Sequence, residues 1–192
     1  MLATLEQIKN RLGITSADTG DDEQLTAWLL MVSARFNRYC RRQFIRNTNA
    51  TDCFRAHEIH IPVSCYPIES VTAFDIQSAN VWTEVAGVEY LIGPQLNTIE
   101  ILSPIGGRQD LARVRYVGGY VAPGTTPGEG QTPLPEDINR ACIEQVVHFW
   151  QNKNRLGLTT VGGAAGSLSQ FAELDLLPMV KNILNDYVRI TI

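Results

Sequence analysis

The clearest hydrophobic pattern in the sequence runs from Leu25 to Cys40, where apolar side chains recur with the 3.6-residue period of an α-helix. These apolar positions are Leu25, Trp28, Leu29, Val32, Phe36, Tyr39 and Cys40. Asp21 and Gln24 have the spacing of a capping box just before the run. The pattern therefore predicts a long amphipathic helix of about four turns, whose apolar face must be buried against a partner.

Three further helices are predicted from the same period. The first covers Thr4 to Leu12, with Thr4 as its N-cap and Gly13 as the left-handed residue that ends it. Another begins at Pro135, which suits a first helical position, and Gly157 is expected to cap its far end. The last covers Leu177 to Val188 and leads into a short apolar tail.

The middle of the chain changes to short β-branched and aromatic runs, which proline, glycine and asparagine interrupt. This pattern predicts short strands and turns. The predicted strands are Cys53–Ile61, Ser70–Asp75, Tyr90–Ile92, Thr98–Leu102 and Ala112–Tyr116. The expected fold class is therefore α+β: a bundle of about four helices, with a small antiparallel β domain inserted between the second and third helices.

Changes in composition mark the expected parts of the chain. Residues 1–50 hold the N-terminal helices and residues 51–121 hold the β-rich insert. Residues 122–134 are rich in proline and glycine and predict a linker. Residues 135–192 hold the C-terminal helices, a glycine-rich loop and a docking tail. The loop buries too few side chains to offset its ordering entropy, so contact with a neighbour is expected to order it.

Composition narrows the class of protein. The 192 residues are 44% hydrophobic and 19% charged, which is typical of a folded globular chain. The formal net charge of −4 argues against a dedicated nucleic-acid binder, because such domains usually carry a basic surplus. No signal peptide or membrane span is expected. The four cysteines have no Cys-x-x-Cys spacing and are expected to be reduced and mainly buried.

One group of side chains has the donor atoms of a metal site: Cys53, His57, His60 and Cys65. On one continuous strand Cys53 and His57 share a face while His60 points to the other, so the pattern favours thiols and imidazoles without a metal. The Gly106–Arg108 segment lacks the spacing of a phosphate-binding loop. The sequence places no nucleophile beside His148. We therefore expect no catalytic residue, metal or cofactor.

Four arginines are spaced three and four residues apart and predict a basic strip beside the apolar face of the long helix: Arg35, Arg38, Arg42 and Arg46. The strip is a candidate for a subunit interface or for the wall of a DNA channel. Ion pairs with carboxylates of another subunit are favoured over phosphate contacts, because the arginine fork binds a carboxylate bidentately.

Several short motifs occur once each, one after another along the chain. They are Leu5-Glu6-Gln7-Ile8-Lys9, Tyr39-Cys40-Arg41-Arg42-Gln43-Phe44, Tyr66-Pro67-Ile68-Glu69-Ser70-Val71, Val114-Arg115-Tyr116-Val117-Gly118-Gly119-Tyr120 and Leu134-Pro135-Glu136-Asp137-Ile138. Each motif is weak alone, but their joint order is specific and covers most of the chain. In this order the chain resembles the head-to-tail connector (adaptor or head-completion) proteins of tailed bacteriophages.

The resemblance implies a structural virion protein of the neck, made in the host bacterial cytoplasm, and not an enzyme. It implies a ring, typically of twelve copies, that docks beneath the portal protein, extends the DNA channel and presents a surface to the next neck or tail-completion protein. DNA in the channel would be a non-specific neighbour. The residues that we expect to dock with partners are Tyr187, Val188, Arg189, Ile190, Thr191, Ile192, Gly162, Gly163 and Gly166.

Two alternatives stay open at this point. The first is another phage neck, tail-completion or scaffolding subunit that uses the same helices without binding a portal. The second is a metal-binding enzyme with its site around Cys53 and His57.

Overall fold

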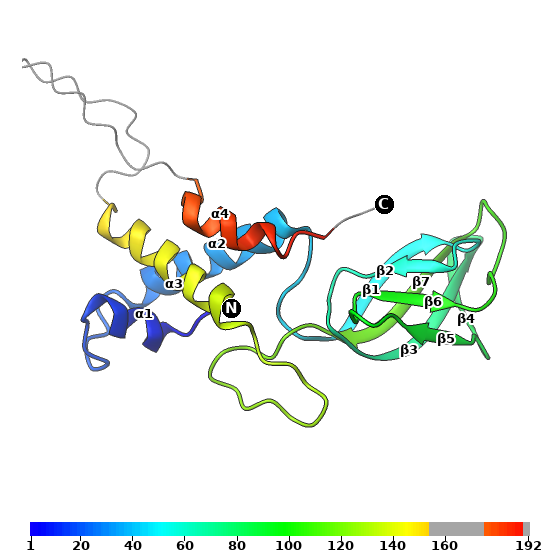
Figure 1. Cartoon of the computed structure of the whole chain (residues 1–192), viewed down its shortest axis with the longest axis horizontal. Coiled ribbons are helices and arrows are strands. Elements are labelled where there is room, and N and C mark those ends of the chain that lie inside the picture. The colour runs from blue at the N-terminus through cyan, green and yellow to red at the C-terminus, as the bar shows by residue number, and fades with distance from the viewer. Residues whose placement is uncertain (154–174, 190–192) are drawn as a thin grey trace, which may run out of the picture. The chain divides into compact units, whose positions relative to one another are not determined.

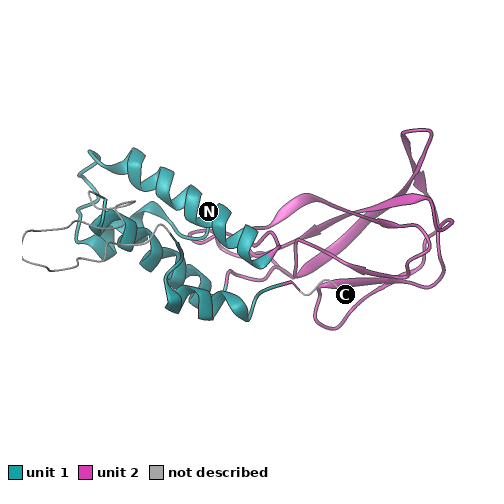
Figure 2. Ribbon diagram, turned by 90° about the horizontal axis from the view of Figure 1, so that it is seen from above, with its two compact units in different colours: residues 1–40, 135–188 teal, residues 41–134, 189–192 magenta. Residues whose placement is uncertain are grey.

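The computed structural model describes residues 1–153 and 175–189 of the chain (Figure 1). These residues form two compact units, one of helices and one of strands (Figure 2). Unit 1 takes residues 1–40 together with the described part of 135–188, and unit 2 takes residues 41–134 and Arg189. All the described strands come between the second and third helices, so the predicted α+β fold with an inserted antiparallel β domain is confirmed.

Unit 1 contains the helices α1 (Leu5–Leu12), α2 (Asp22–Cys40), α3 (Glu136–Gln151) and α4 (Pro178–Asn185). Helix α2 packs against each of the other three. Its buried residues follow the predicted apolar period. Buried side chains of α3 and α4 pack against them. The buried core residues include Leu25, Leu29, Val32, Phe36, Ile138, Cys142, Val146, Phe149, Val180 and Leu184. Each such side chain stabilises the fold by about 1.5–3 kcal/mol relative to its exposed state.

The helix ends follow the predictions in part. Thr4 Oγ1 accepts a hydrogen bond from the backbone N–H of Gln7 at 3.2 Å, and Gly13 has a φ of 71°, so both predicted caps of α1 are confirmed. The predicted end of α3 at Gly157 is wrong, because α3 ends at Gln151 with Asn152 as its C-cap. Helix α4 also ends earlier than predicted, at Asn185.

A buried amide fixes the start of α4. Gln145 on α3 is fully buried, and its Oε1 accepts a hydrogen bond from the backbone N–H of Leu177 at 2.9 Å. Its Nε2 donates to the carbonyl oxygen of Asp175 at 3.3 Å. Both bonds satisfy backbone groups that precede α4, where Pro178 occupies the first turn.

Unit 2 is an antiparallel β structure of two sheets. Its strands are β1 (Asn47–Arg55), β2 (His60–Pro62), β3 (Ile68–Ser78), β4 (Val81–Val85), β5 (Tyr90–Ile92), β6 (Thr98–Ile101) and β7 (Leu111–Gly118). One sheet has the order β1-β7-β3-β4 and the other has the order β2-β6-β5. Side chains of both sheets share one buried cluster, which includes Phe54, Ile61, Phe74, Ile99, Val114 and Tyr116.

The strand predictions were wrong at two places. The predicted strand Cys53–Ile61 is two strands that belong to different sheets, because the chain turns between Arg55 and His60. Strand β4 was not predicted. It pairs with β3 through a two-residue turn, Ala79-Asn80, whose residues both have positive φ (47° and 64°). Alanine rarely adopts this conformation, so Ala79-Asn80 is not a turn pair that predicts a hairpin.

Candidate functional site

A buried arginine lies near the start of unit 2. Arg42 is 4% exposed, and its guanidinium lies over the rings of Tyr66, Phe44 and Tyr120, with the guanidinium carbon 3.3, 4.7 and 5.3 Å from the ring centres. It donates a hydrogen bond to the carbonyl oxygen of Tyr66. We call these four residues the Arg42 cluster. Aromatic faces attract a desolvated cation, so the cluster joins three segments that are distant in the sequence.

Backbone hydrogen bonds hold the same three segments together. The N–H of Arg46 donates to the carbonyl of Tyr120 at 2.8 Å, and the N–H of Tyr120 donates to that of Phe44 at 2.7 Å. Gly119 has a φ of +100°, and a Cβ there would lie 2.9 Å from backbone atoms of Arg46. Only glycine fits such a position. The Arg-Arg-Gln-Phe, Tyr-Pro-Ile and Gly-Gly-Tyr motifs of the sequence therefore meet at one junction.

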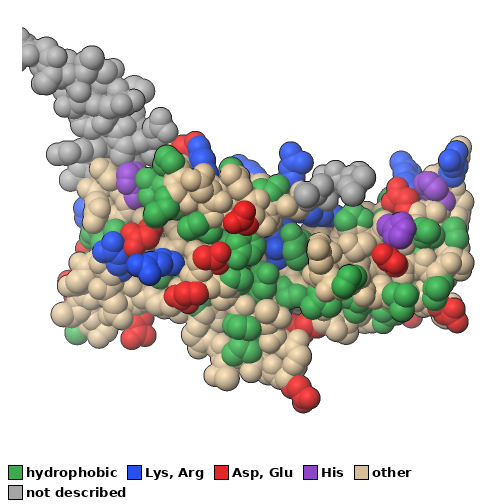
Figure 3. Space-filling model, viewed as in Figure 1, with side chains coloured by type: hydrophobic (Ala, Val, Ile, Leu, Met, Phe, Trp, Pro, Cys, Tyr) green, Lys and Arg blue, Asp and Glu red, His purple; other side chains and the backbone are tan. Residues whose placement is uncertain are grey.

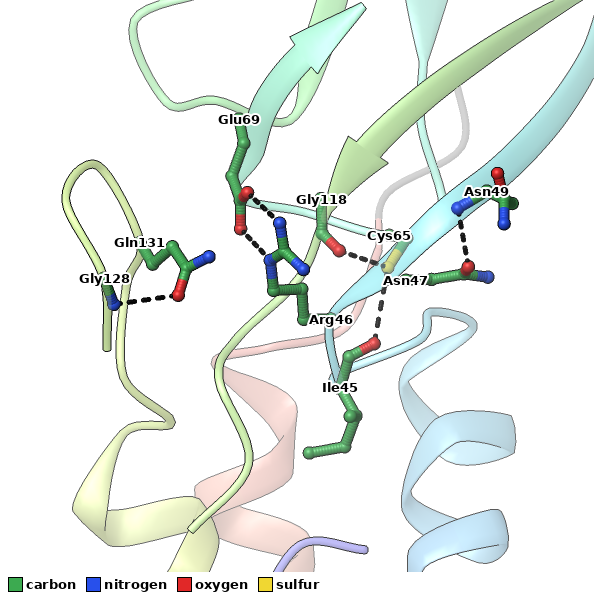
Figure 4. A network of polar contacts seen from close by, with 9 residues as sticks. All are labelled: Ile45, Arg46, Asn47, Asn49, Cys65, Glu69, Gly118, Gly128 and Gln131. Carbon is green, nitrogen blue, oxygen red and sulfur yellow. Dashed lines mark hydrogen bonds and ion pairs between the residues drawn. The ribbon is translucent and has the colours of Figure 1, made fainter. Parts of the chain in front are cut away.

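Figure 4 shows the polar contacts beside this junction. Arg46 makes a bidentate ion pair with Glu69, at 2.7 and 2.8 Å. Hydrogen bonding to that carboxylate raises the pKa of Arg46. The buried thiol of Cys65 lies 3.1 Å from the carbonyl oxygen of Gly118 and 3.6 Å from that of Ile45. Burial raises the pKa of Cys65 to about 11, so this thiol stays neutral and unreactive near pH 7.

The predicted arginine strip is wrong as a single helical strip. Helix α2 ends at Cys40, and Arg41 follows with a left-handed φ of 52°. Arg42 and Arg46 therefore belong to unit 2, where aromatic rings and Glu69 hold them. Arg35 and Arg38 do lie on α2; Arg35 packs over the ring of Phe149 at 5.9 Å, and Arg38 is exposed. A role for these four residues in an interface or channel stays a prediction.

The four sequence candidates for a metal site do not come together. Strand β1 ends at Arg55, so Cys53 and His57 do not share one strand face as we expected. Cys53 is exposed, whereas Cys65 is buried in the core of unit 2. Within residues 1–153 and 175–189, no three His, Cys, Asp or Glu side chains are placed to hold a metal ion.

Exposed leucines lie beside His60 and Glu100 on the outer side of the three-stranded sheet. Leu91 on β5 pairs with Glu100 on β6, which pairs with His60 on β2, so the three side chains share one face. Leu102 lies two residues beyond Glu100, and Leu91 and Leu102 are 60% and 63% exposed. His60 Nδ1 lies 3.5 Å from Glu100. We call this surface the β5–β6 face; exposed hydrophobic side chains over these strands are visible in Figure 3.

The outer face of the four-stranded sheet is charged instead. The carboxylate of Asp75 on β3 accepts hydrogen bonds from Arg113 at 2.7 Å and from Arg115 at 3.0 and 3.2 Å. Arg115 also bonds Glu84 on β4 at 2.7 Å, and Arg113 lies over the ring of Trp82 at 4.5 Å. Burial by itself raises the pKa of Asp75, but the two guanidinium groups outweigh it and hold the pKa below its usual range.

Unit 1 carries a groove between α3 and α4 with a volume of about 330 Å³. Its apolar lining is Ala141, Met179 and Ile183, and its charged lining is Asp137, Arg140 and Glu144. Two of these charges already have partners within unit 1. The hydroxyl of Tyr187 donates to Asp137 at 2.9 Å, and Arg11 makes an ion pair with Glu144 at 2.9 Å.

The predicted docking residues at the C-terminus are described only as far as Arg189. Tyr187 and Val188 belong to unit 1, and Tyr187 is tied to Asp137. Arg189 donates to the carbonyl oxygen of Pro62 in unit 2 at 2.6 Å, while its buried Nε has no hydrogen-bond partner among the described residues. Ile190, Thr191, Ile192, Gly162, Gly163 and Gly166 lie outside the described residues.

The sequence reasoning missed the β5–β6 face and the α3–α4 groove. Tyr90-Leu91-Ile92 is apolar at every position, so it indicates a strand with apolar side chains on both faces, but such a run does not show that one face is exposed. No helix in the described part of the chain has both the length and the apolar character needed to cross a membrane.

Solved structures with the same fold come from gene transfer agent particles. A chain of the neck of an empty gene transfer agent particle, computed with C6 symmetry, is similar with a TM-score of 0.66 and 16% identity, covering 98% of this chain and 90% of that chain. A chain of the native gene transfer agent virion gives 0.61 and 18%, with the same coverage. A chain of the native neck computed with C12 symmetry gives 0.59 and 16%, covering 98% and 89%.

No curated protein matches the sequence. The sequence does match one protein family, named head completion protein, over residues 1–190. This match covers nearly the whole chain, including all the motifs that meet at the Arg42 cluster. The chain therefore belongs to the head completion protein family.

Proposed function

We propose that this chain is a head-to-tail connector subunit of a phage-like particle. Twelve copies form a ring beneath the portal protein, extend its DNA channel and give the next neck or tail-completion protein a surface to bind. The observation that carries the proposal is the family match over residues 1–190. Similar chains from particle necks, one of them computed with C12 symmetry, support the ring and the location.

The described surfaces suit binding better than catalysis. The β5–β6 face exposes two leucines, and exposed apolar patches usually mark sites of protein association. Polar groups that catalysis would need are used in internal contacts instead: Tyr116 bonds Asp52 at 2.6 Å, and Asp75 bonds two arginines. We propose that the chain carries out no reaction and needs no cofactor.

We propose that the C-terminal residues from Tyr187 to Ile192 dock onto the portal, with the loop that contains Gly162, Gly163 and Gly166 as a second contact. A terminal segment contributes little to a core and can order on a partner. Deleting residues 190–192 should therefore leave the subunit folded but weaken its incorporation. Arg38, which is exposed on α2, is the arginine we propose for the subunit interface or the channel wall.

The direct test mixes the purified full chain with portal rings from the same particle and follows co-sedimentation. We expect a complex with twelve subunits per ring, and a weaker complex for the chain that lacks residues 190–192. If the chain is found in purified necks but does not contact the portal protein there, it is another neck, tail-completion or scaffolding subunit. Stoichiometric zinc in the pure protein, with loss of folding on chelation, would instead support the metal-binding alternative.

A further inference from the structure

Helix α2 has apolar side chains on two opposite faces. The inner face is buried in unit 1 through Leu25, Leu29, Val32 and Phe36. The outer face carries Ala27, Leu30, Met31 and Ala34, which are all exposed; Leu30 is 54% exposed and Met31 is 38% exposed. An apolar helix face that stays exposed is a candidate surface for association. Among the described residues, the outer face of α2 therefore has no covering partner.

The exposed residues form a narrow stripe with a charge at each end. Its six members are Glu23, Ala27, Leu30, Met31, Ala34 and Arg38, and we call them the α2 stripe. At 100° per residue they fall within a sector about 100° wide. The two alanines run along its centre line and the two larger side chains flank them. Glu23 and Arg38 lie roughly 22 Å apart along the helix axis.

The α2 stripe is complementary to itself in one orientation only. Glu23 and Arg38 are equally far from the midpoint between Leu30 and Met31, and so are Ala27 and Ala34. When two copies pack antiparallel around that midpoint, each Glu23 lies opposite an Arg38 and each Ala27 opposite an Ala34, while the two Leu30 side chains meet on one flank and the two Met31 side chains on the other. A parallel arrangement would instead place like charges opposite each other, which is unfavourable.

We propose that the α2 stripe is a docking surface for a second copy of this chain, which packs antiparallel to form a two-fold dimer of the free subunit. The central alanines let the two helix axes approach to about 8 Å, the lower end of helix packing distances. A two-fold contact is closed at two copies. The subunits of a ring are related by rotation about one axis and cannot make this contact, so the dimer is a state distinct from the proposed ring and does not depend on it.

The expected strength of the dimer follows from its size. A stripe of one helix buries much less than the roughly 1,600 Å² of a standard stable interface. We therefore expect a weak, reversible dimer with a Kd of about 10–100 µM. The terminal ion pairs are exposed at the rim, so higher salt should weaken the dimer further.

Sedimentation of the full chain tests the proposal, over a concentration range from about 1 µM to 1 mM. We expect a monomer–dimer equilibrium. The substitution Arg38→Glu turns both terminal attractions into repulsions and should raise the Kd roughly tenfold. The double variant Glu23→Arg with Arg38→Glu exchanges the two charges and should return the Kd to within about twofold of the original. A parallel contact pairs like charges in all three proteins and predicts no loss for Arg38→Glu, so loss followed by recovery indicates that Glu23 faces Arg38.

A second pair of variants tests the apolar part of the stripe. Leu30→Lys should abolish dimer formation, whereas Met179→Lys should leave it unchanged; Met179 is 53% exposed on α4 and lies in the α3–α4 groove. All these sites are exposed, and circular dichroism and thermal melting confirm that each variant is folded. The proposal is overturned if the original chain stays monomeric or forms only larger rings, or if the double variant shows no recovery. Equal loss for Met179→Lys would also overturn it, because the stripe would then dock into the groove of a neighbour.

Discussion

The guanidinium carbon of Arg42 lies 3.3 Å from the centre of the Tyr66 ring, and the same group donates to the carbonyl oxygen of Tyr66. Arg42 thereby contacts both the ring and the backbone of Tyr66. Phe44 and Tyr120 complete the cluster. The segment after α2, the residues just before β3 and those just after β7 all meet here. The Arg42 cluster therefore holds these three segments of unit 2 together.

The first prediction follows from this contact. Arg42→Lys keeps the charge but loses the planar group that stacks on the rings, and lysine is costlier to desolvate. We expect the free energy of unfolding of unit 2 to fall by about 1–3 kcal/mol. Urea denaturation measures the change. Arg108→Lys, at an exposed position, serves as the control and should change the value by less than about 0.5 kcal/mol. Equal effects of the two substitutions would contradict a stabilising role for the cluster.

The buried hydroxyl of Tyr116 should make the free energy of unfolding of unit 2 fall at alkaline pH. Tyr116 is fully buried, and burial together with the nearby Asp52 raises the pKa of its hydroxyl well above the usual value near 10. The folded protein therefore holds this proton more tightly than the unfolded chain does. The stabilisation is complete below about pH 10 and is lost as the pH rises through the folded pKa.

The measurement is the free energy of unfolding between about pH 9 and 12, for the original chain and for Tyr116→Phe. The substitution leaves the backbone N–H of Cys65 without its acceptor, so the variant should be about 1–3 kcal/mol less stable at neutral pH. Its stability should also fall less steeply above pH 10. Parallel curves for the two proteins would show that Tyr116 does not set the alkaline limit.

The sequence predicts those elements whose pattern depends only on local period. The apolar spacing of α2 and the caps of α1 were found because their residues interact within a few positions of each other. The arginine strip failed because α2 ends at Cys40, before the left-handed Arg41, and because the position of Arg42 depends on the rings of Tyr66 and Tyr120. No local rule predicts contacts across such distances in sequence.

The binding surfaces were harder to predict for the same reason. Leu91 lies in a short strand that is apolar on both faces, and such a run is normally read as a buried strand. Only the sheet order, in which no described strand covers the outer side of β5 and β6, shows that this leucine is exposed. The helix ends predicted at Gly157 and Val188 failed because fraying and tertiary contacts decide where a helix ends.

The ion pairs of Asp75 should make the free energy of unfolding of unit 2 fall at acid pH. The pKa of Asp75 lies below the usual range, so the stabilisation from its ion pairs is present above about pH 4 and is lost as the pH falls through the lowered pKa. Asp75→Asn should lower the free energy of unfolding at pH 7 by about 1–2 kcal/mol, since both arginines are partly exposed and solvent screens them. Denaturation at pH 7 and pH 3 measures both values. A difference between variant and original that is as large at pH 3 as at pH 7 would rule out the ion pairs as its source.

The last prediction concerns the β5–β6 face and rests on the proposed function. A lysine at Leu91 or Leu102 places a charge on this face without touching the core, because both side chains are about 60% exposed in a single copy. We expect each variant to fold with a free energy of unfolding within about 0.5 kcal/mol of the original. If a subunit or neck partner covers this face, the buried charge has no partner in the complex, and incorporation into particles should fall at least about tenfold.

Val81→Lys is the matched control, because Val81 is 63% exposed, like Leu102, but lies on β4 in the other sheet. Particles are assembled with each variant, purified, and compared for the amount of this chain they contain. Normal incorporation of Leu91→Lys and Leu102→Lys would show that the β5–β6 face is free in the particle. Loss of incorporation for Val81→Lys as well would show that charge anywhere on the β unit disturbs assembly, and that the two leucines have no special part in it.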